Sequence, residues 1–505
     1  MGAAGQTTVA LLLRGSKLYI RGMARNAPSS LERGRFGLIL IRVGPGPESG
    51  HSRPDPIPEN PPNQSTSNNR IRHGQRLHGK GLLICLVDWC KQASSLPIDG
   101  LGYSICCRLI DEFISTQPPS LTLHLIITTR DERKSHDTLS KLFAHLRQKS
   151  RELRDNLNSR VTIQSEQVDL TSLQSVHALS THLRTTLPRL DVVFLNAGYG
   201  GLTGIKWLRA AWVIPTDLRY EITYPSYNVS AVGLTTKSQT SSRDEPALGT
   251  VFTSNVFGHY ILVHLLCPLF TSASTAQRSG RVIWISSIEG YASTFTLGDM
   301  QGLAAESAYK SSKRLTDILI LTSSRLSTRQ YVSKFLGDDV SKSQKDEIDK
   351  REGCRPNMYL VHPGICATSF VPLPFLLYCC MVFTFYLARW LGSPWHTVSA
   401  YKGAAAPVWL ALAPQKELDE LEADGKSKWG SCVSRGGEES VMRTEVEGWG
   451  VRGQVEALAA KELRGRRRGV HELSMEEQER FEELGRECWQ QLEGLRTEWA
   501  KRIGW

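Results

Sequence analysis

The stretch LDVVFLNAG, residues 190–198, decides the fold class. It begins as a short, continuous apolar run of strand length and ends in Asn196-Ala197-Gly198. A short apolar run closed by turn residues is typical of a strand that is buried on both faces. Residues directly after such a strand lie at the carboxyl edge of a parallel sheet, where α/β proteins bind their ligands.

Similar runs lie on both sides of this stretch. LTLHLIITTR starts at Leu121, VTIQSEQVDL starts at Val161, GRVIWISS ends at Ser287 and NMYLVHPG ends at Gly364. KWGS, around Trp429, is a candidate last strand. Helical patterns separate these runs, and this alternation predicts an α/β fold with a Rossmann-type, doubly wound parallel sheet.

The first 80 residues have a different composition. They are rich in Pro, Asn, Ser and Gly and hold too little apolar surface to offset the entropy of ordering, so residues 1–80 are expected to be a disordered extension. They contain twelve Lys and Arg against four Asp and Glu, an excess of eight within a net charge of +11. Because this charge lies outside the predicted fold, no nucleic-acid partner is expected. No Cys-x-x-Cys pair occurs, so no metal site is expected.

Four motifs follow one another in a specific order. LNAG is followed by NVFGHY with Asn255, by VIWISS ending in Ser286-Ser287, and by YKSSK with Tyr309 and Lys313. Tyr309 and Lys313 are four residues apart, so they share one face of a helix. This ordered set resembles the short-chain dehydrogenase/reductase family, which transfers hydride between a nicotinamide and a carbonyl or alcohol carbon.

The resemblance implies a role for each of these side chains. Tyr309 is the acid/base, and its pKa near 10 would need to be lowered by roughly 2–3 units, by Lys313 and the positive nicotinamide, to work efficiently near neutral pH. Lys313 also holds the nicotinamide ribose. Ser287 orients the substrate oxygen, with Ser286 as the alternative. Asn255 matches the asparagine that keeps a water-linked proton relay in place; the alternative is a purely structural amide.

The second predicted strand indicates the cofactor. IITTR ends in Arg130, and a guanidinium there suits the 2′-phosphate of NADP, whereas a carboxylate would suit NAD. A solvated surface arginine is the alternative. The resemblance places further residues at the cofactor: Asp169 near the adenine, and the remaining positions along its length, which are Asn196, Ala197, Gly198, Pro363, Gly364, Ile365 and Thr368.

The phosphate-binding turn is incomplete. The family pattern is a strand followed by T-G-x-x-x-G-x-G, and Gly100 and Gly102 match its second and third glycines. Leu96 stands where the first glycine belongs. The nearest strand-like run, GLLICLV at residues 81–87, ends far upstream. The first strand and the early glycine loop are therefore expected to be missing or replaced, which predicts weak NADPH binding by this chain.

These features divide the chain into four predicted parts. After the extension, residues 81–99 replace the first strand and turn, residues 100–435 form the NADP-binding domain, and residues 436–505 form a charged tail. The tail ends in an amphipathic helix with a capping box, Ser474-x-x-Glu477. The apolar stripe of this helix is Phe481, Leu484, Cys488, Leu492, Leu495 and Trp499.

Residues 370–391, FVPLPFLLYCCMVFTFYLARWL, contain one charge. As a helix they would be about 33 Å long, enough to reach across a bilayer. Because KWGS must return to the same sheet, we expect monotopic or hairpin insertion rather than a full crossing. A buried core helix that forms a pocket wall is the alternative.

From about Gly100 to the C-terminus, the long insertion after LNAG, the 22-residue spacing from Ser287 to Tyr309 and the tail resemble the fungal 3-keto-steroid reductases of sterol C-4 demethylation. This implies NADPH-dependent reduction of a 3-keto-sterol to the 3β-alcohol at the endoplasmic reticulum or lipid droplet, facing the cytosol. Other sterol-biosynthesis enzymes are candidate partners. Two alternatives stay open: a membrane scaffold without turnover, and a reductase of another lipophilic ketone, retinoid or acyl.

Overall fold

The computed structural model describes residues 38–42, 84–87, 100–240, 242–271, 280–337, 355–368, 373–456, 458 and 462–505. A nine-stranded sheet runs through this part in the order β11-β10-β9-β8-β5-β1-β2-β3-β4. The predicted runs form β3 (Leu123–Thr129), β4 (Val161–Gln167), β5 (Val192–Leu195), β8 (Arg281–Ile285) and β9 (Asn357–His362). KWGS begins β10 (Lys428–Val433), parallel to β9, and β11 (Glu439–Thr444) closes that edge antiparallel. The predicted α/β class is confirmed.

The centre of the sheet differs from the expectation. Two strands lie there: β2 (Ile84–Val87), parallel to β3, and β1 (Leu38–Arg42), antiparallel to β2 and β5. The sheet therefore does not lack a central member among its described strands. Residues 38–42, within the segment expected to be disordered, thus form a strand whose backbone pairs with β5. The turn with Leu96 lies outside the described residues.

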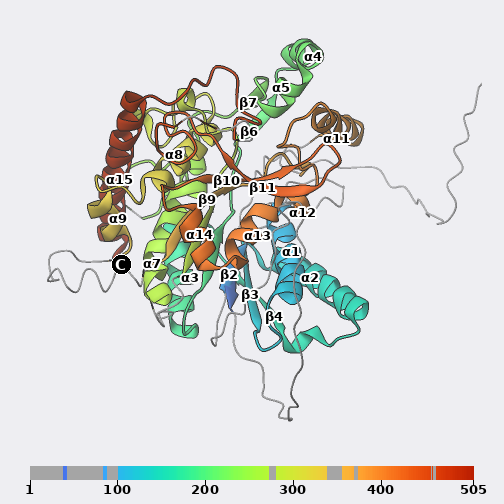
Figure 1. Cartoon of the computed structure of the whole chain (residues 1–505). Helices are drawn as coiled ribbons and strands as arrows, with labels where there is room; N and C mark the ends of the chain where they lie inside the picture. Colours follow the sequence, from blue (N-terminus) through green and yellow to red (C-terminus); the bar gives the residue numbers. More distant parts are fainter. Residues whose placement is uncertain are drawn as a thin grey trace, which may run out of the picture. The chain divides into compact units, whose positions relative to one another are not determined.

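Helices cover both faces of the sheet (Figure 1). On one face lie α1 (Leu101–Thr116), α2 (Glu132–Leu153), α12 (Ala400–Gly403) and α13 (Ala405–Leu412); on the other lie α3 (Leu173–Thr186), α7 (Gly258–Thr271) and α8 (Ala308–Thr322). Asp131, Ser172 and Ser307 cap α2, α3 and α8 by accepting from backbone amides. Shorter helices are α6 (Thr250–Phe252), α9 (Arg329–Phe335) and α14 (Gln415–Leu421).

The C-terminal tail packs on the same core as the predicted NADP-binding domain. Helix α15 (Met475–Ile503) begins with the predicted capping box and packs on α8. Trp489 donates from its indole to the carbonyl oxygen of Leu319 at 3.1 Å, and the hydroxyl of Tyr260 donates to Glu493 at 2.6 Å. The predicted stripe is the buried side of this helix, and residues 34–505 form one unit by contacts.

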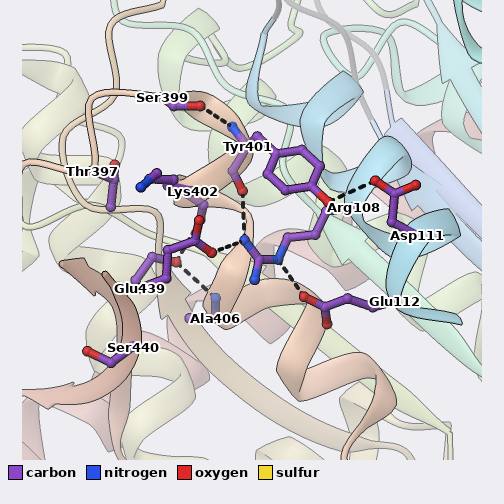
Figure 2. A network of polar contacts seen from close by, with 12 residues as sticks. Arg108, Asp111, Glu112, Thr397, Ser399, Tyr401, Lys402, Ala406, Glu439 and Ser440 are labelled. Atoms are coloured by element: carbon purple, nitrogen blue, oxygen red, sulfur yellow. Dashed lines mark hydrogen bonds and ion pairs between the residues drawn. The ribbon is translucent and has the colours of Figure 1, made fainter. Parts of the chain in front are cut away.

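A charged network ties α1 to the opposite end of the sheet (Figure 2). The guanidinium of Arg108 donates to Glu112 at 2.6 Å, to the carbonyl oxygen of Tyr401 at 3.2 Å, and to Glu439 at the start of β11. The hydroxyl of Tyr401, on α12, donates to Asp111 at 2.8 Å. This network fixes the position of α1, the helix that begins at the predicted phosphate turn.

The insertion after LNAG forms a separate projection. Strands β6 (Leu202–Ile205) and β7 (Asn228–Ser230) pair at its base, and α4 (Trp207–Thr216) and α5 (Leu218–Thr223) lie between them. Figure 1 shows α4 and α5 extending from the same end of the molecule as α11 (Phe375–Trp390). Helix α5 packs on α11.

Helix α11 is shorter than the sequence suggested. It spans 16 residues, about 24 Å, because it begins after Pro374 and is followed by Gly392 at φ +97°. One side of the helix is exposed, with Leu376 at 72% and Phe383 at 60%, so α11 is not a buried core helix. Its other side borders a cavity through Leu377 and Met381, as the pocket-wall alternative expected. Among the described residues, one helix, Thr250–Phe270, is long and apolar enough to cross a membrane, and 83% of it is buried inside the protein.

Candidate active site

A cavity of about 1050 Å³ opens at the carboxyl ends of β5, β8 and β9. Its wall is formed by the start of α1, the residues after the three strands, α8, α4 and α11. Gly100, Gly102, Asn196, Gly198 and the segment from Pro363 to Cys366 all border it. This is the edge of a parallel sheet at which ligands bind, and the cavity lies at the upper end of the usual size for ligand pockets.

Helix α8 places Tyr309 and Lys313 on the cavity wall. Lys313 is buried, and its ammonium donates to the carbonyl oxygen of Ile285 at 2.8 Å. Its Nζ lies 5.6 Å from the centre of the Tyr309 ring. Burial lowers the pKa of Lys313 to about 8; Asp317 opposes this shift and Lys428 adds to it. The lysine is therefore close to its titration point near neutral pH.

The two serines after β8 have different partners. The hydroxyl of Ser286 is buried and donates to Asp317 Oδ1 at 2.5 Å. Ser287 hydrogen-bonds to Tyr309, and its Oγ accepts from the backbone amide of Glu289 at 3.2 Å. The structure thus brings Ser287, Tyr309 and Lys313 together, and it commits the hydroxyl of Ser286 to a carboxylate. The chemical roles assigned to these residues stay predictions.

The pKa of Tyr309 departs from the expectation of a lowered value. Burial raises the pKa of this phenol, and the Glu289 carboxylate raises it further, while the hydrogen bond with Ser287 lowers it. Glu289 is a site residue that sequence reasoning missed, and it forms an ion pair with Lys310 at 3.1 Å. A phenol held in its protonated form is suited to act as an acid, which is the direction that ketone reduction requires.

Asn255 lies in a π-helical turn, Thr253–Phe257, before α7. Its side-chain oxygen accepts from the backbone amide of Tyr199 at 2.6 Å, and its side-chain nitrogen donates to Ser312 on α8 at 2.9 Å. Asn255 therefore joins the loop after β5 to α8. These contacts fit the structural role that was left open for this residue, and the relay role stays a prediction. π-Helical turns are frequent at functional sites.

A buried ion pair beneath the serines was not predicted. Lys428, the first residue of β10, lies 2.5 Å from Asp317 Oδ2, with both side chains at most 3% exposed. The same ammonium donates to the carbonyl oxygen of Ser287 at 2.6 Å. Asp317 thus holds Ser286 and Lys428 together, and Lys428 fixes the backbone at Ser287. The only signal in the sequence is that Asp317 follows Lys313 by one helical turn.

The segment after β9 packs closely against residues 395–398, one of which is strained. Gly364 has φ +71°, and a Cβ there would lie 2.4 Å from the carbonyl oxygen of Trp395. The amide of Val398 donates to the carbonyl oxygen of Ile365 at 3.0 Å, and Val398 itself has φ +62°. A β-branched residue in this region costs about 1–3 kcal/mol, and such strain occurs mainly at ligand-binding segments. Pro363, Gly364, Ile365 and Thr368 all border the cavity.

Arg130 and Asp169 are brought together, but not into the cavity wall. The Nε of Arg130 donates to Asp169 Oδ2 at 2.8 Å, and both side chains are 27% exposed. The two residues lie directly after β3 and shortly after β4. Ala197, the remaining predicted cofactor residue, is buried behind Asn196 and Gly198. The structure therefore places Asn196 and Gly198 at the cavity, whereas Arg130 and Asp169 form a pair that does not line it.

Lys313 gives the site a predicted pH dependence. Since its pKa is about 8, the ammonium is lost as the pH rises through that value. We expect kcat/KM for ketone reduction to fall above about pH 8 with the slope of a single ionisation, because the site loses a positive charge beside Tyr309. A pH–rate profile at limiting substrate reports this ionisation. A profile that stays flat well above this pH would show that the charge of Lys313 is not used.

A parallel sheet whose carboxyl edge bears a serine, a tyrosine and a lysine four residues further along the same helix defines a nucleotide-dependent oxidoreductase. The chain belongs to the 3-keto-steroid reductases of the short-chain dehydrogenase/reductase family. A 3-keto-steroid reductase of Aspergillus fumigatus is 46% identical over 417 residues, covering 80% of this chain and 92% of the relative. One of Gibberella zeae is 38% identical over 450 residues, covering 80% and 93%.

Other comparisons add little. No family model matches the sequence. Among solved structures, the chain is similar to salutaridine reductase from Papaver somniferum, with 16% identity, a TM-score of 0.34 and coverage of 62% of this chain and 92% of that one. An NADP complex of RhlG from Pseudomonas aeruginosa has 18% identity, a TM-score of 0.34 and coverage of 62% and 85%.

Proposed function

We propose that this chain reduces the 3-keto group of a sterol intermediate to the 3β-alcohol in ergosterol-type biosynthesis. The observation that carries the proposal is the convergence of Ser287, Tyr309 and Lys313 on a cavity whose outer wall is apolar, formed by Leu373, Leu377, Met381 and Phe385. Such a wall suits a large, rigid and nearly apolar substrate. The curated relatives, which the chain covers over more than nine tenths of their length, are named for the same activity.

Each of these residues has a separate role in the reduction. The carbonyl carbon would receive its hydride from a nicotinamide cofactor bound in this cavity. Tyr309 donates its proton to the ketone oxygen, and Ser287 donates a hydrogen bond to the same oxygen and stabilises its developing negative charge. Lys313 provides a positive charge beside the phenol and holds the ribose. Lys428 holds the backbone at Ser287 in position.

The described part of the site fits a dinucleotide. The N-terminus of α1 borders the cavity at Gly100 and Gly102, where a helix N-terminus and the absence of a Cβ suit a pyrophosphate. Gly198 presents no side chain to the same space. Arg130 directly follows β3, and a guanidinium at the end of this strand suits the 2′-phosphate, which supports NADPH over NADH. When the phosphate binds, Asp169 would either stay bonded to the Arg130 guanidinium beside it or be displaced from the guanidinium by the phosphate.

Arg130→Ala tests the cofactor choice. We expect KM for NADPH to rise about tenfold or more, since a charge-assisted hydrogen bond contributes roughly 1.5–3 kcal/mol, and KM for NADH to stay unchanged. Arg133→Ala, an exposed arginine three residues away, is the matched control. Steady-state kinetics with both cofactors measure the effect. Equal losses with NADPH and NADH would remove Arg130 from phosphate recognition.

The activity itself is tested with the purified chain, NADPH and a 3-ketosteroid dispersed in detergent. Consumption of NADPH with formation of the 3β-alcohol, identified by mass spectrometry, is the expected result. NADPH binding without turnover of any ketone would favour the scaffold, and turnover of retinoid or acyl ketones alone would favour the other reductase alternative.

We also propose that the protein associates with the endoplasmic reticulum or lipid-droplet surface through α11. Its exposed side chains include Phe375, Leu376, Phe383 and Trp390, each more than half exposed, and its charged residue Arg389 is buried. An apolar helix of this length with an exposed apolar face is typical of monotopic insertion.

Leu376→Glu with Phe383→Glu tests this association. Both side chains are exposed and neither borders the cavity, so the double variant should fold normally and move from the membrane pellet to the soluble fraction. Fractionation of cells that express the full chain measures the shift. Leu153→Glu with Leu326→Glu, exposed apolar residues elsewhere, is the control. Retention of the α11 variant in the pellet would exclude α11 as the main anchor.

A further inference from the structure

Helix α4 of the insertion has an exposed apolar face of its own. Leu208 is 91% exposed, Trp212 73% and Trp207 55%. Leu208 and Trp212 are four residues apart, so they lie on one side of the helix. Of the seventeen large hydrophobic side chains exposed in the described part of the chain, ten lie on α4, on α11 or directly after α11. A concentration of this kind marks an interaction surface.

The projection that carries α4 is held firmly. Arg468 forms an ion pair with Asp217, the residue between α4 and α5. The hydroxyl of Tyr224, directly after α5, donates to the carbonyl oxygen of Gly465 at 2.8 Å. Helix α5 packs on α11. The exposed side chains of α4 are thus held outward by a fixed framework.

Both helices border the same cavity. Ala210 and Ile214 of α4 line it, and so do Leu377 and Met381 of α11. Each helix therefore has one side toward the cavity and another toward the outside, and the two stand at the same end of the molecule (Figure 1). A surface that covers the outer face of α11 would therefore also contact α4.

The charges near α4 suit a lipid surface. Arg209 on α4 and Arg219 on α5 are exposed, and among the described residues neither forms an ion pair. Lys206 and Arg468 nearby are paired with Glu306 and Asp217. Arg209 donates to the hydroxyl of Ser226 at 3.0 Å and keeps its positive charge. Exposed Trp and Leu beside such arginines are typical of helices that lie at the level of lipid headgroups.

We propose that α4 inserts into the same lipid surface as α11, so that the bilayer covers the mouth of the cavity and the ketone enters from the lipid between the two helices. The route of the ketone rests on the proposed function, whereas contact between α4 and lipid does not. A second copy of this chain and a partner enzyme are the other occupants that the experiment separates.

The test uses the full chain and vesicles of phosphatidylcholine with phosphatidylserine. Leu208→Gln with Trp212→Gln changes two exposed residues that do not border the cavity. We expect at least tenfold weaker vesicle binding in flotation, because two large side chains lose an apolar environment. Leu153→Gln with Leu326→Gln is the matched control and should bind as the unmodified chain does.

A second readout reports the position of α4 directly. With brominated acyl chains in the vesicles, tryptophans that enter the lipid lose fluorescence, and Trp212→Phe should remove part of this quenching. Unchanged binding and unchanged quenching would overturn the proposal. A change in oligomeric state without lipid, with vesicle binding intact, would assign the face to a second copy. Binding that requires an added sterol-pathway enzyme would assign it to a protein partner.

Turnover separates this proposal from the proposed function. The α4 double variant should lose rate, about tenfold or more, on a ketosteroid dissolved in vesicles, and keep its rate on the same ketosteroid in detergent. Equal loss in both media would mean that α4 shapes the cavity rather than contacts lipid, and would overturn the entry route. No turnover by the unmodified chain in either medium would overturn the reductase and leave the vesicle-binding result standing.

Discussion

Tyr309→Phe should lower kcat for ketone reduction by a factor of about 10²–10⁴, because it removes the one hydroxyl that the site holds protonated beside Ser287. The aromatic ring that faces Lys313 remains, so NADPH binding should change little. Steady-state turnover and a direct titration of NADPH measure the two effects separately.

A loss of turnover without a loss of NADPH binding would identify Tyr309 as the proton donor. Ser287→Ala should also lower kcat with cofactor binding intact, and Ser286→Ala should instead lower stability, since its hydroxyl is bonded to Asp317 rather than turned to Tyr309. Full turnover by Tyr309→Phe would disprove the proton-donor assignment. A loss of NADPH binding in the same variant would mean that the residue has a structural role.

Asp317→Asn should destabilise the folded state by about 3–5 kcal/mol, since it leaves the Lys428 ammonium buried without its counter-charge. That is a large share of the stability of an ordinary domain, roughly 5–15 kcal/mol. Lys428→Met should have a similar cost, because Asp317 then keeps only the Ser286 hydroxyl as a partner from this network. Urea unfolding of the full chain measures both.

The double variant Asp317→Asn with Lys428→Met is the decisive control. It removes both charges, so it should recover most of the stability that either single variant loses. Turnover should stay low in the double variant, because the carbonyl oxygen of Ser287 still lacks the ammonium that fixes it. Single variants as stable as the unmodified chain would show that the pair contributes nothing to the fold.

Much of the fold could be predicted because its signals are local. The apolar runs that became β3, β5, β8 and β9, and the capping box of α15, are properties of a few neighbouring residues. Strand β1 was missed although LILIR is itself a short apolar run, because the composition of residues 1–80 predicted disorder. The run also does not indicate its partner, since its place depends on a gap beside β5. The same limit applies to the tail, whose stripe indicated burial but not the helix that buries it.

The site shows a similar division. The order of Asn255, Ser287, Tyr309 and Lys313 is readable along the chain, and the sheet brings the last three to one wall. The partner of Asp317 is not readable, since Lys428 is distant in the chain and meets it only when β10 joins β9. The raised pKa of Tyr309 was missed for a related reason: burial and the Glu289 charge act through space.

The position of the cavity mouth, between α4 and α11, determines which substrate concentration controls the rate of this enzyme. If the mouth opens into lipid as we propose, the quantity that sets the rate is the mole fraction of ketone in the bilayer. Adding empty vesicles at constant total substrate would then slow the reaction by surface dilution. An inhibitor's potency would likewise follow its partition into the membrane, so two compounds with equal affinity for the cavity could differ greatly in effect.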